Sequence, residues 1–198
     1  DTMVLMQAFG RGLVAEPYLA TVLLFGGLLQ AGASDDVQGE NIPRIIAGEL
    51  QGAFAYLERE SRYVMSDIAT RAEQRGGEWT INGEKTVVRN GGAAQKLIVA
   101  ARSAGAQADE AGVTLLLVDA ASAGITRTVY RMTDGQQAAN ITFDNVVAEA
   151  VIGKPGEGYA LMTPVIDAAR LAVCANALGA MEALNAQTVD YCKTPVKT

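Results

Sequence analysis

The chain of 198 residues contains no histidine. This absence excludes Ser–His–Asp and Cys–His catalysis, zinc sites of the HExxH type and proton transfer through an imidazole within the chain. Any chemistry must therefore use carboxylates, an organic cofactor or groups from another chain.

Cysteine is scarce as well. The two cysteines, Cys174 and Cys192, lie in no CxxC or cysteine-rich pattern, which argues against zinc, iron–sulfur and disulfide frameworks. Both fall in one predicted helix, where a rise of about 1.5 Å per residue separates them by about 27 Å, too far for a disulfide. Free thiols fit a reducing compartment, although the favoured interpretation is two small apolar core or surface residues.

Basic residues are outnumbered, with 16 Lys and Arg against 22 Asp and Glu and a net charge of −6. A nucleic-acid-binding protein usually carries the opposite balance, so nucleic acid is not an expected partner. Apolar residues make up 49% of the chain, which is typical of a globular protein. The long uncharged run, from Pro17 to Ser34, contains Pro, Gly and Gln and predicts a buried core helix instead of a membrane span.

Residues 1–50 are predicted to be helical. Leu5, Phe9 and Leu13 recur every four residues and form one apolar stripe. The Glu16-Pro17 step should end this helix, because the residue before proline is pushed out of the α region. A second helix is predicted from Tyr18 to about Leu29, and a third short segment follows from Asp35.

Residues 52–152 change to short runs rich in Val, Ile, Thr and Leu, typical of an antiparallel sandwich or barrel. Asn82-Gly83, between the runs Trp79–Ile81 and Glu84–Val88, predicts a hairpin with a type I′ turn. Further strands are predicted at four places: Lys96–Arg102, Val113–Asp119, Ile125–Tyr130 and Asn140–Phe143.

Glu157 to Cys192 is predicted to form one long helix. An apolar stripe with spacings of 3, 4 and 3 runs along it: Leu171, Cys174, Leu178 and Met181. Frequent alanines allow close backbone approach, so we expect this helix to pack against another helix or another chain. The predicted fold class is therefore α+β, with helices, then an antiparallel middle β-barrel, then a long helix.

Three clusters invite a chemical interpretation. The segment GKPGEG at 153–158 lacks the GxxxxGK[ST] pattern and predicts a turn into the long helix. Glu58 and Glu60 resemble a glycosidase pair, but Arg59 and Arg62 favour a solvated charge cluster. Asp167 and Arg170 share a helix face. They form either a surface pair worth under about 1 kcal/mol or a cation site for a phosphate or carboxylate.

Taken together, several stretches resemble the acyl-CoA dehydrogenase family in order and spacing. They are GELQGAFAYLERE, GGEWTINGEKTVVRNGG, VTLLLVDAASAGIT, ANITFDNVVAEAVIGKPGEGY and DAARLAVCANALGAMEALNAQTVDY. The similarity covers nearly the whole chain. It is closest to the small-subunit type of the bacterial enzymes, the pimeloyl-CoA dehydrogenase small subunit among them.

This resemblance implies three domains: the remnant of an N-terminal helical domain at 1–50, a middle β-barrel domain at 51–153, and the first long helix of a C-terminal helical bundle at 154–198. It also implies an FAD-dependent oxidoreductase acting on CH–CH groups in fatty acid metabolism. In that family a glutamate takes the α-proton of an acyl-CoA, hydride passes to FAD, and electron-transfer flavoprotein accepts the electrons. The implied partners are acyl-CoA, that flavoprotein and another acyl-CoA dehydrogenase subunit in a homo- or hetero-oligomer, in a bacterial cytoplasm.

The family's flavin-contacting positions transfer to five residues. Phe54 matches the aromatic residue that begins the family's flavin-contacting strand. Tyr56 and Leu57 follow in the same strand and match positions whose backbones contact the flavin. Leu57 replaces a threonine, Val87 replaces the tryptophan that covers the isoalloxazine, and Arg89 replaces a threonine or serine. The resemblance thus assigns FAD binding to these positions, with backbone contacts in place of side-chain contacts.

The remaining transfers concern the substrate and the catalytic base. Asp167 and Arg170 match the helix position that faces the CoA end of the substrate. Pro195 stands where the family usually carries an arginine that reaches a neighbouring subunit's FAD. The resemblance places the catalytic glutamate beyond Thr198, so no catalytic residue and no metal ligand is assigned within the chain.

Three hypotheses follow from these residues. The first is a dehydrogenase subunit with FAD and acyl-CoA at a site shared between chains. The second is a non-catalytic structural subunit of a heteromeric acyl-CoA dehydrogenase that has lost flavin binding, since its Thr, Ser and Trp positions are replaced. The third is an unrelated β-barrel binding module formed by residues 52–152.

Overall fold

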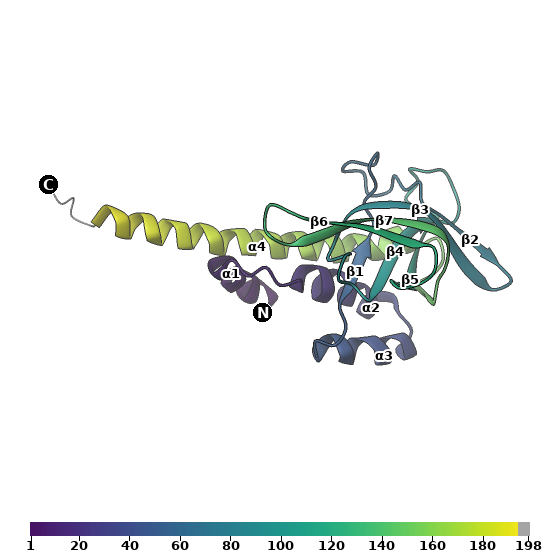
Figure 1. The fold of residues 1–198 in the computed structure, drawn as a ribbon, viewed down its shortest axis with the longest axis horizontal. Coiled ribbons are helices and arrows are strands. Elements are labelled where there is room, and N and C mark those ends of the chain that lie inside the picture. Colours follow the sequence, from purple (N-terminus) through teal and green to yellow (C-terminus); the bar gives the residue numbers. More distant parts are fainter. Residues whose placement is uncertain (194–198) are drawn as a thin grey trace. The chain divides into compact units, whose positions relative to one another are not determined.

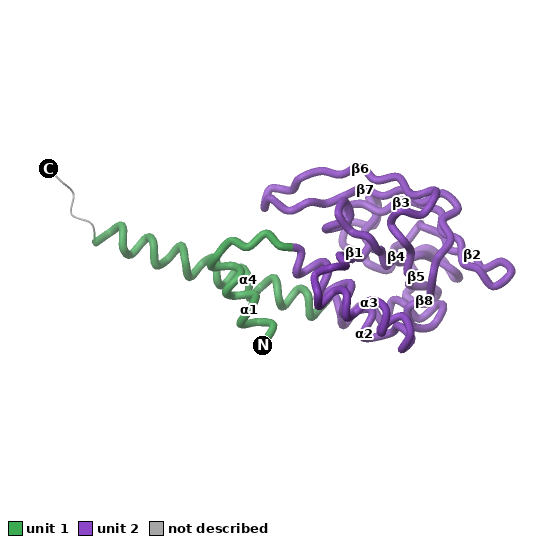
Figure 2. Tube along the Cα trace, turned by 60° about the horizontal axis from the view of Figure 1, so that its bottom comes forward, with its two compact units in different colours: residues 1–16, 167–198 green, residues 17–166 purple. Residues whose placement is uncertain are grey.

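The computed structural model describes residues 1–193. These residues form two compact units, one made of residues 1–16 with the residues from 167 onward and the other of residues 17–166 (Figure 2). The boundaries between these units fall after residues 16 and 166. The domain limits at residues 50 and 153 describe the domains of the family and stay a prediction. Pro195 and Thr198 lie outside the described residues.

Helices precede and follow a run of strands, as Figure 1 shows. The helices are α1 (Thr2–Gly12), η1 (Tyr18–Gly26, a π-helix), α2 (Gly27–Gly32), α3 (Asp35–Ile46) and α4 (Gly158–Lys193). The strands are β1 (Gly52–Ala55), β2 (Arg71–Arg75), β3 (Glu78–Arg89), β4 (Lys96–Arg102), β5 (Val113–Asp119), β6 (Ile125–Arg131), β7 (Gln137–Val147) and β8 (Ala150–Ile152).

All eight strands belong to one sheet, ordered β6-β7-β3-β2-β4-β5-β8, with β1 paired to β4. The β1–β4 and β2–β4 pairs are parallel and the other pairs are antiparallel. The predicted α+β class is confirmed. The described sheet ends at β6 and β8 and is not closed, so the word barrel applies to it only loosely.

The core of the 17–166 unit lies on both faces of β4 and β5, which are buried along nearly their whole length. Such two-sided burial explains their continuous apolar sequences. On one face, Leu97 and Val99 join a cluster with Leu116 and Val118. Elsewhere in this unit, Phe25 of η1 packs directly over a glycine of β1, which places η1 against the sheet.

The predicted Asn82-Gly83 hairpin is wrong. β3 continues through both residues, and the turn lies at Gly76 and Gly77, whose φ angles are 60° and 93°. Gly83 has φ 147° at a register shift between β3 and β7, and a Cβ there would lie 2.7 Å from Thr70. This glycine therefore serves a bulge and a close approach instead of a turn.

The predicted helices and the last four predicted strands are confirmed, since α1, η1 with α2, α3, α4, β4, β5, β6 and β7 occupy their positions. By length and composition alone, α4 is also long and apolar enough to cross a membrane. Helices packed inside soluble proteins pass the same test, so this finding alone assigns no membrane.

In the other unit, α1 packs against α4 through two glycines. A Cβ on Gly10 would collide with the backbone at Asn176, and a Cβ on Gly179 would collide with the backbone at Gln7. Gln7 also donates to the Glu182 carboxylate, at 2.8 Å. The predicted apolar stripe lies largely outside this contact, because Leu171, Leu178 and Met181 are about half exposed, at 59%, 46% and 54%, and Cys174 is exposed.

Candidate functional site

The segment that follows β1 runs beside β3 and forms a cavity wall with it. The Thr86 N–H donates to the Leu57 carbonyl at 2.9 Å, which fixes the two segments together. A cavity of about 400 Å³ opens here, lined by Leu57, Glu58, Arg59, Arg62, Thr86, Val87, Tyr130 and Asn140. The structure thus brings together two predicted flavin-contacting positions, Leu57 and Val87.

Val87 has a left-handed backbone, with φ 51°. A β-branched residue is costly in this conformation, and such strain collects at functional sites. The Val87 N–H donates to Asn140 Oδ1 at 3.2 Å, and the Tyr130 hydroxyl lies 3.3 Å from the same oxygen. Neither Tyr130 nor Asn140 was expected from the sequence, because the β3–β7 pairing places Asn140 and the β6–β7 pairing places Tyr130 beside Val87.

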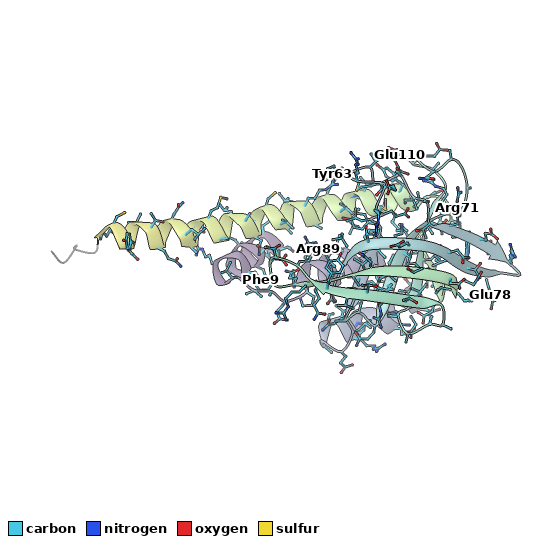
Figure 3. The ribbon with its side chains drawn as sticks, turned by 45° about the horizontal axis from the view of Figure 1, so that its top comes forward. Phe9, Tyr63, Arg71, Glu78, Arg89 and Glu110 are labelled. Atoms are coloured by element: carbon cyan, nitrogen blue, oxygen red, sulfur yellow. The ribbon has the colours of Figure 1, made fainter. Side chains whose placement is uncertain are left out.

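The other three predicted flavin positions do not line this cavity. Phe54 and Tyr56 point to the same side of the chain and stack, with ring centroids 4.8 Å apart. Phe54 is buried, at 3% exposure. Arg89, labelled in Figure 3, pairs with Asp134 at 3.6 Å, and the two side chains are 41% and 49% exposed.

Leu57 also offers a backbone donor. Its carbonyl accepts from Thr86, whereas its N–H makes no hydrogen bond to any residue of the described part of the chain. A free N–H beside apolar side chains suits a flat ligand that carries a hydrogen-bond acceptor at its edge.

Glu58 and Lys85 form a buried ion pair behind this wall, 2.7 Å apart, with side-chain exposures of 9% and 0%. The Glu58 carboxylate also accepts from the N–H groups of Ala69 at 2.8 Å and Thr70 at 3.0 Å. The predicted solvated charge cluster is therefore wrong for Glu58. No sequence signal pointed to this pair, because Glu58 and Lys85 lie 27 residues apart in the chain.

Burial and charge oppose each other in this pair. Burial lowers the pKa of Lys85 to about 8, although Glu58 pulls it upward. Burial would raise the pKa of Glu58, but the charge and hydrogen bond of Lys85, with hydrogen bonds from Thr70 and Ala69, together lower it below its usual value. Glu58 is therefore ionised at neutral pH.

Arg102 of β4 organises the loops next to this pair. It is buried, at 1% exposure, and its guanidinium donates to the carbonyls of Ser66, Gln107, Asp109 and Ala111 at 2.6–2.8 Å. These carbonyls come from both loops beside β2 and β4, so Arg102 ties the two loops together.

A second cavity, of about 250 Å³, also borders Glu58. Ser61, Asp67, Thr70, Glu84 and Gln107 are among its lining residues. Glu58, Arg59 and Thr86 line both cavities, which makes the Glu58 segment the wall between them.

The remaining predicted clusters lie outside this site. Asp167 and Arg170 form an ion pair at 2.7 Å on α4, with both side chains 58% exposed. The GKPGEG segment is a turn into α4, as predicted, and Glu157 directly precedes the helix. No cluster of three potential metal ligands occurs among residues 1–193.

The family profile and the curated relatives point to one family. Residues 53–146 match the profile described as "Acyl-CoA dehydrogenase, middle domain". The acyl-CoA dehydrogenase of Bacillus subtilis is 33% identical over 161 residues, which cover 79% of this chain and 42% of that protein. The chain thus spans about two fifths of this curated relative and about half of the solved structure described next.

Solved structures show the same fold. Butyryl-CoA dehydrogenase from Megasphaera elsdenii superposes with a TM-score of 0.91 and 26% identity, over 98% of this chain and 53% of that one. The glutaryl-CoA dehydrogenase–glutaryl-CoA complex also has a TM-score of 0.91, at 22% identity over 98% of this chain and 51% of that one, and supports the fold alone.

Proposed function

The chain belongs to the acyl-CoA dehydrogenase family, and from this premise we propose that it is a subunit of an FAD-dependent enzyme that converts an acyl-CoA to a 2-enoyl-CoA. The cavity beside Leu57 and Val87 carries the proposal, because two of the positions that match flavin contacts meet there. FAD, when bound, supplies the hydride acceptor, and the protein orients it.

The residues that line the cavity offer a backbone donor and apolar contacts to a flavin, but they lack the side-chain hydrogen bonds of the family. The free Leu57 N–H, the apolar Leu57 and Val87 side chains and the Tyr130 ring suit the edge and face of a flat heteroaromatic ring. Leu57 and Val87 provide no side-chain hydrogen bond, and Arg89 is engaged by Asp134. Flavin binding here therefore rests on backbone donors and apolar contact.

Substrate and partners follow from the family in the same way. Asp167 and Arg170, which form an ion pair on α4, would face the CoA part of the acyl-CoA, where a guanidinium can pair with a phosphate or carboxylate. Electron-transfer flavoprotein would accept the electrons. A second acyl-CoA dehydrogenase subunit, identical or different, would complete the assembly in a bacterial cytoplasm.

The test is FAD titration of the purified full-length protein, with and without its partner subunit, followed by flavin absorbance and fluorescence. We expect saturable FAD uptake and formation of 2-enoyl-CoA from acyl-CoA in the assembled enzyme. Val87→Glu should abolish uptake by placing a charge on the apolar surface, whereas Val129→Glu, on an exposed position of β6, should not. A colourless assembly that takes up no FAD contradicts the proposal.

A second candidate is a non-catalytic structural subunit with the same fold. The observation that favours it is the pair of apolar residues, Leu57 and Val87, where the family holds flavin by side chains. It predicts no FAD uptake in any assembly, and a partner enzyme whose thermal stability falls when this chain is removed.

A further inference from the structure

We propose that Lys85 and Glu58 are positioning residues that hold the wall between the two cavities and thereby set the geometry of the Leu57–Val87 cavity. The inference starts from where the pair lies. The Glu58 carboxylate is the meeting point of three chain segments: 56–58 after β1, 69–70 before β2, and 84–86 within β3.

Each contact of the pair joins two of these segments. Lys85 Nζ donates to Glu58 Oε1 at 2.7 Å and to the Tyr56 carbonyl at 3.4 Å, which binds the first segment to β3. Glu58 in turn accepts the Ala69 and Thr70 N–H groups, at 2.8 and 3.0 Å, which binds the first segment to the second. Removing the charge from either residue therefore loosens both junctions.

The adjacent residues show what the pair positions. Leu57 lies between Tyr56 and Glu58, and Val87 lies two residues beyond Lys85. The Thr86–Leu57 hydrogen bond also links these two parts of the wall, at 2.9 Å. With the ion pair broken, this bond carries more of the separation of Leu57 from Val87.

Burial makes the pair sensitive to the loss of one partner. Lys85 is fully buried, and a buried charge without its counter-ion is strongly destabilising because water cannot replace the lost interaction. The segment 58–64 can respond by opening, since Arg59, Glu60, Arg62, Tyr63 and Val64 are exposed. We therefore expect a local opening at this segment while the β4–β5 core stays closed.

The experiment is amide hydrogen exchange on the full chain, comparing Lys85→Met with the wild type. We expect the protection factors of Ala69, Thr70 and Thr86 to fall by about tenfold or more, while Val99 in β4 stays within about threefold. Lys96→Met is the matched control. Lys96 forms an ion pair with Glu149 at a distance of 2.6 Å, and neither residue lines the cavity. Should Lys85→Met not fold, Glu58→Gln applies the same test with little change of shape.

A pH profile separates positioning from simple stabilisation. In the wild type, protection of Ala69 and Thr70 should rise as the pH increases above about 8, because an opening that exposes Lys85 returns its pKa toward 10.5 and is disfavoured once the buried lysine is neutral. This step should be absent from Lys85→Met. The charged groups that act on Lys85 are Glu58 from the loop and Arg102 from β4. Unchanged protection in Lys85→Met, an equal loss at Val99, or the absence of the wild-type step overturns the inference.

The consequence for a ligand rests on the proposed function. If FAD occupies the cavity, Lys85→Met should weaken its binding by about tenfold or more, whereas Lys96→Met should not. If the wild type takes up no FAD, the proposed function is wrong. The amide exchange experiment then tests the role of Lys85 and Glu58 independently of a ligand. Full FAD affinity in a variant with lost protection shows that the pair does not set the cavity.

Discussion

At the scale of single residues, the chain keeps a lysine where burial strongly disfavours its charge. The pKa of Lys85 lies at about 8 against an ordinary value of 10.5, because burial outweighs the attraction of Glu58. Between these two values the unfolded chain binds more protons than the folded chain. The free energy of unfolding due to Lys85 therefore rises from about pH 8 to 10.5 and is lowest below pH 8.

Glu58→Gln should extend to lower pH the range in which Lys85 makes the free energy of unfolding depend on pH. The Glu58 charge raises the pKa of Lys85, so its removal should lower that pKa by about 1–3 pH units, as expected for a lost counter-ion within hydrogen-bond range. The measurement is an NMR titration of the Lys85 side chain. Glu84→Gln, on the neighbouring exposed residue of β3, should leave the Lys85 pKa where it is. A Lys85 pKa that is the same in Glu58→Gln and wild type contradicts the ion pair.

At the scale of elements, glycines lie where two segments approach closely. Their neighbours in the sequence do not show whether such a glycine forms a turn or a close contact. Asn82-Gly83 carries the turn signal, yet the turn forms at Gly76 and Gly77. The reason is the register: β3 must continue to Arg89 to pair with β7, and Gly83 lets it pass Thr70. β4, β5 and α4 were predictable because their patterns are continuous and do not depend on such contacts.

Gly83→Ala should destabilise the 17–166 unit by about 2–4 kcal/mol, since a Cβ would lie 2.7 Å from the Thr70 backbone at a φ of 147°. Urea unfolding followed by tryptophan fluorescence measures this change. Gly39→Ala, in α3 with open space around it, is the control and should stabilise by up to about 1 kcal/mol. Equal stability of Gly83→Ala and wild type would show that β3 does not approach Thr70.

The α1–α4 contact gives a second prediction at this scale. Gly179→Ala should separate α1 from α4, because the added methyl collides with the Gln7 carbonyl. We expect faster amide exchange along α1, by about tenfold or more, without a change in β4. Gly12→Ala is the matched control, since its Cβ meets only Val14, at 3.5 Å. Exchange along α1 that is equally fast in both variants contradicts the packing.

At the scale of the whole molecule, the resemblance and no single motif supplied the candidate site, whose flavin-binding role stays a prediction. Leu57 and Val87 came from the family pattern, and they meet in one cavity. Tyr130, Asn140 and the burial of Glu58 were not predictable, because they depend on which strands pair and on which loop covers Lys85. Charge runs in sequence do not reveal whether a carboxylate is solvated or buried.

The exposed apolar side chains along α4 predict self-association of the chain. Leu171, Leu178, Met181 and Leu184 are each about half exposed or more, at 59%, 46%, 54% and 62%. Exposed apolar side chains gathered on one helix favour association, as the sequence predicted for this stripe. The chain of 198 residues should therefore self-associate, and Leu178→Glu with Met181→Glu should reduce this by about tenfold or more in dissociation constant. Analytical ultracentrifugation measures it, with Val129→Glu on β6 as the control, and a monomeric wild type contradicts the prediction.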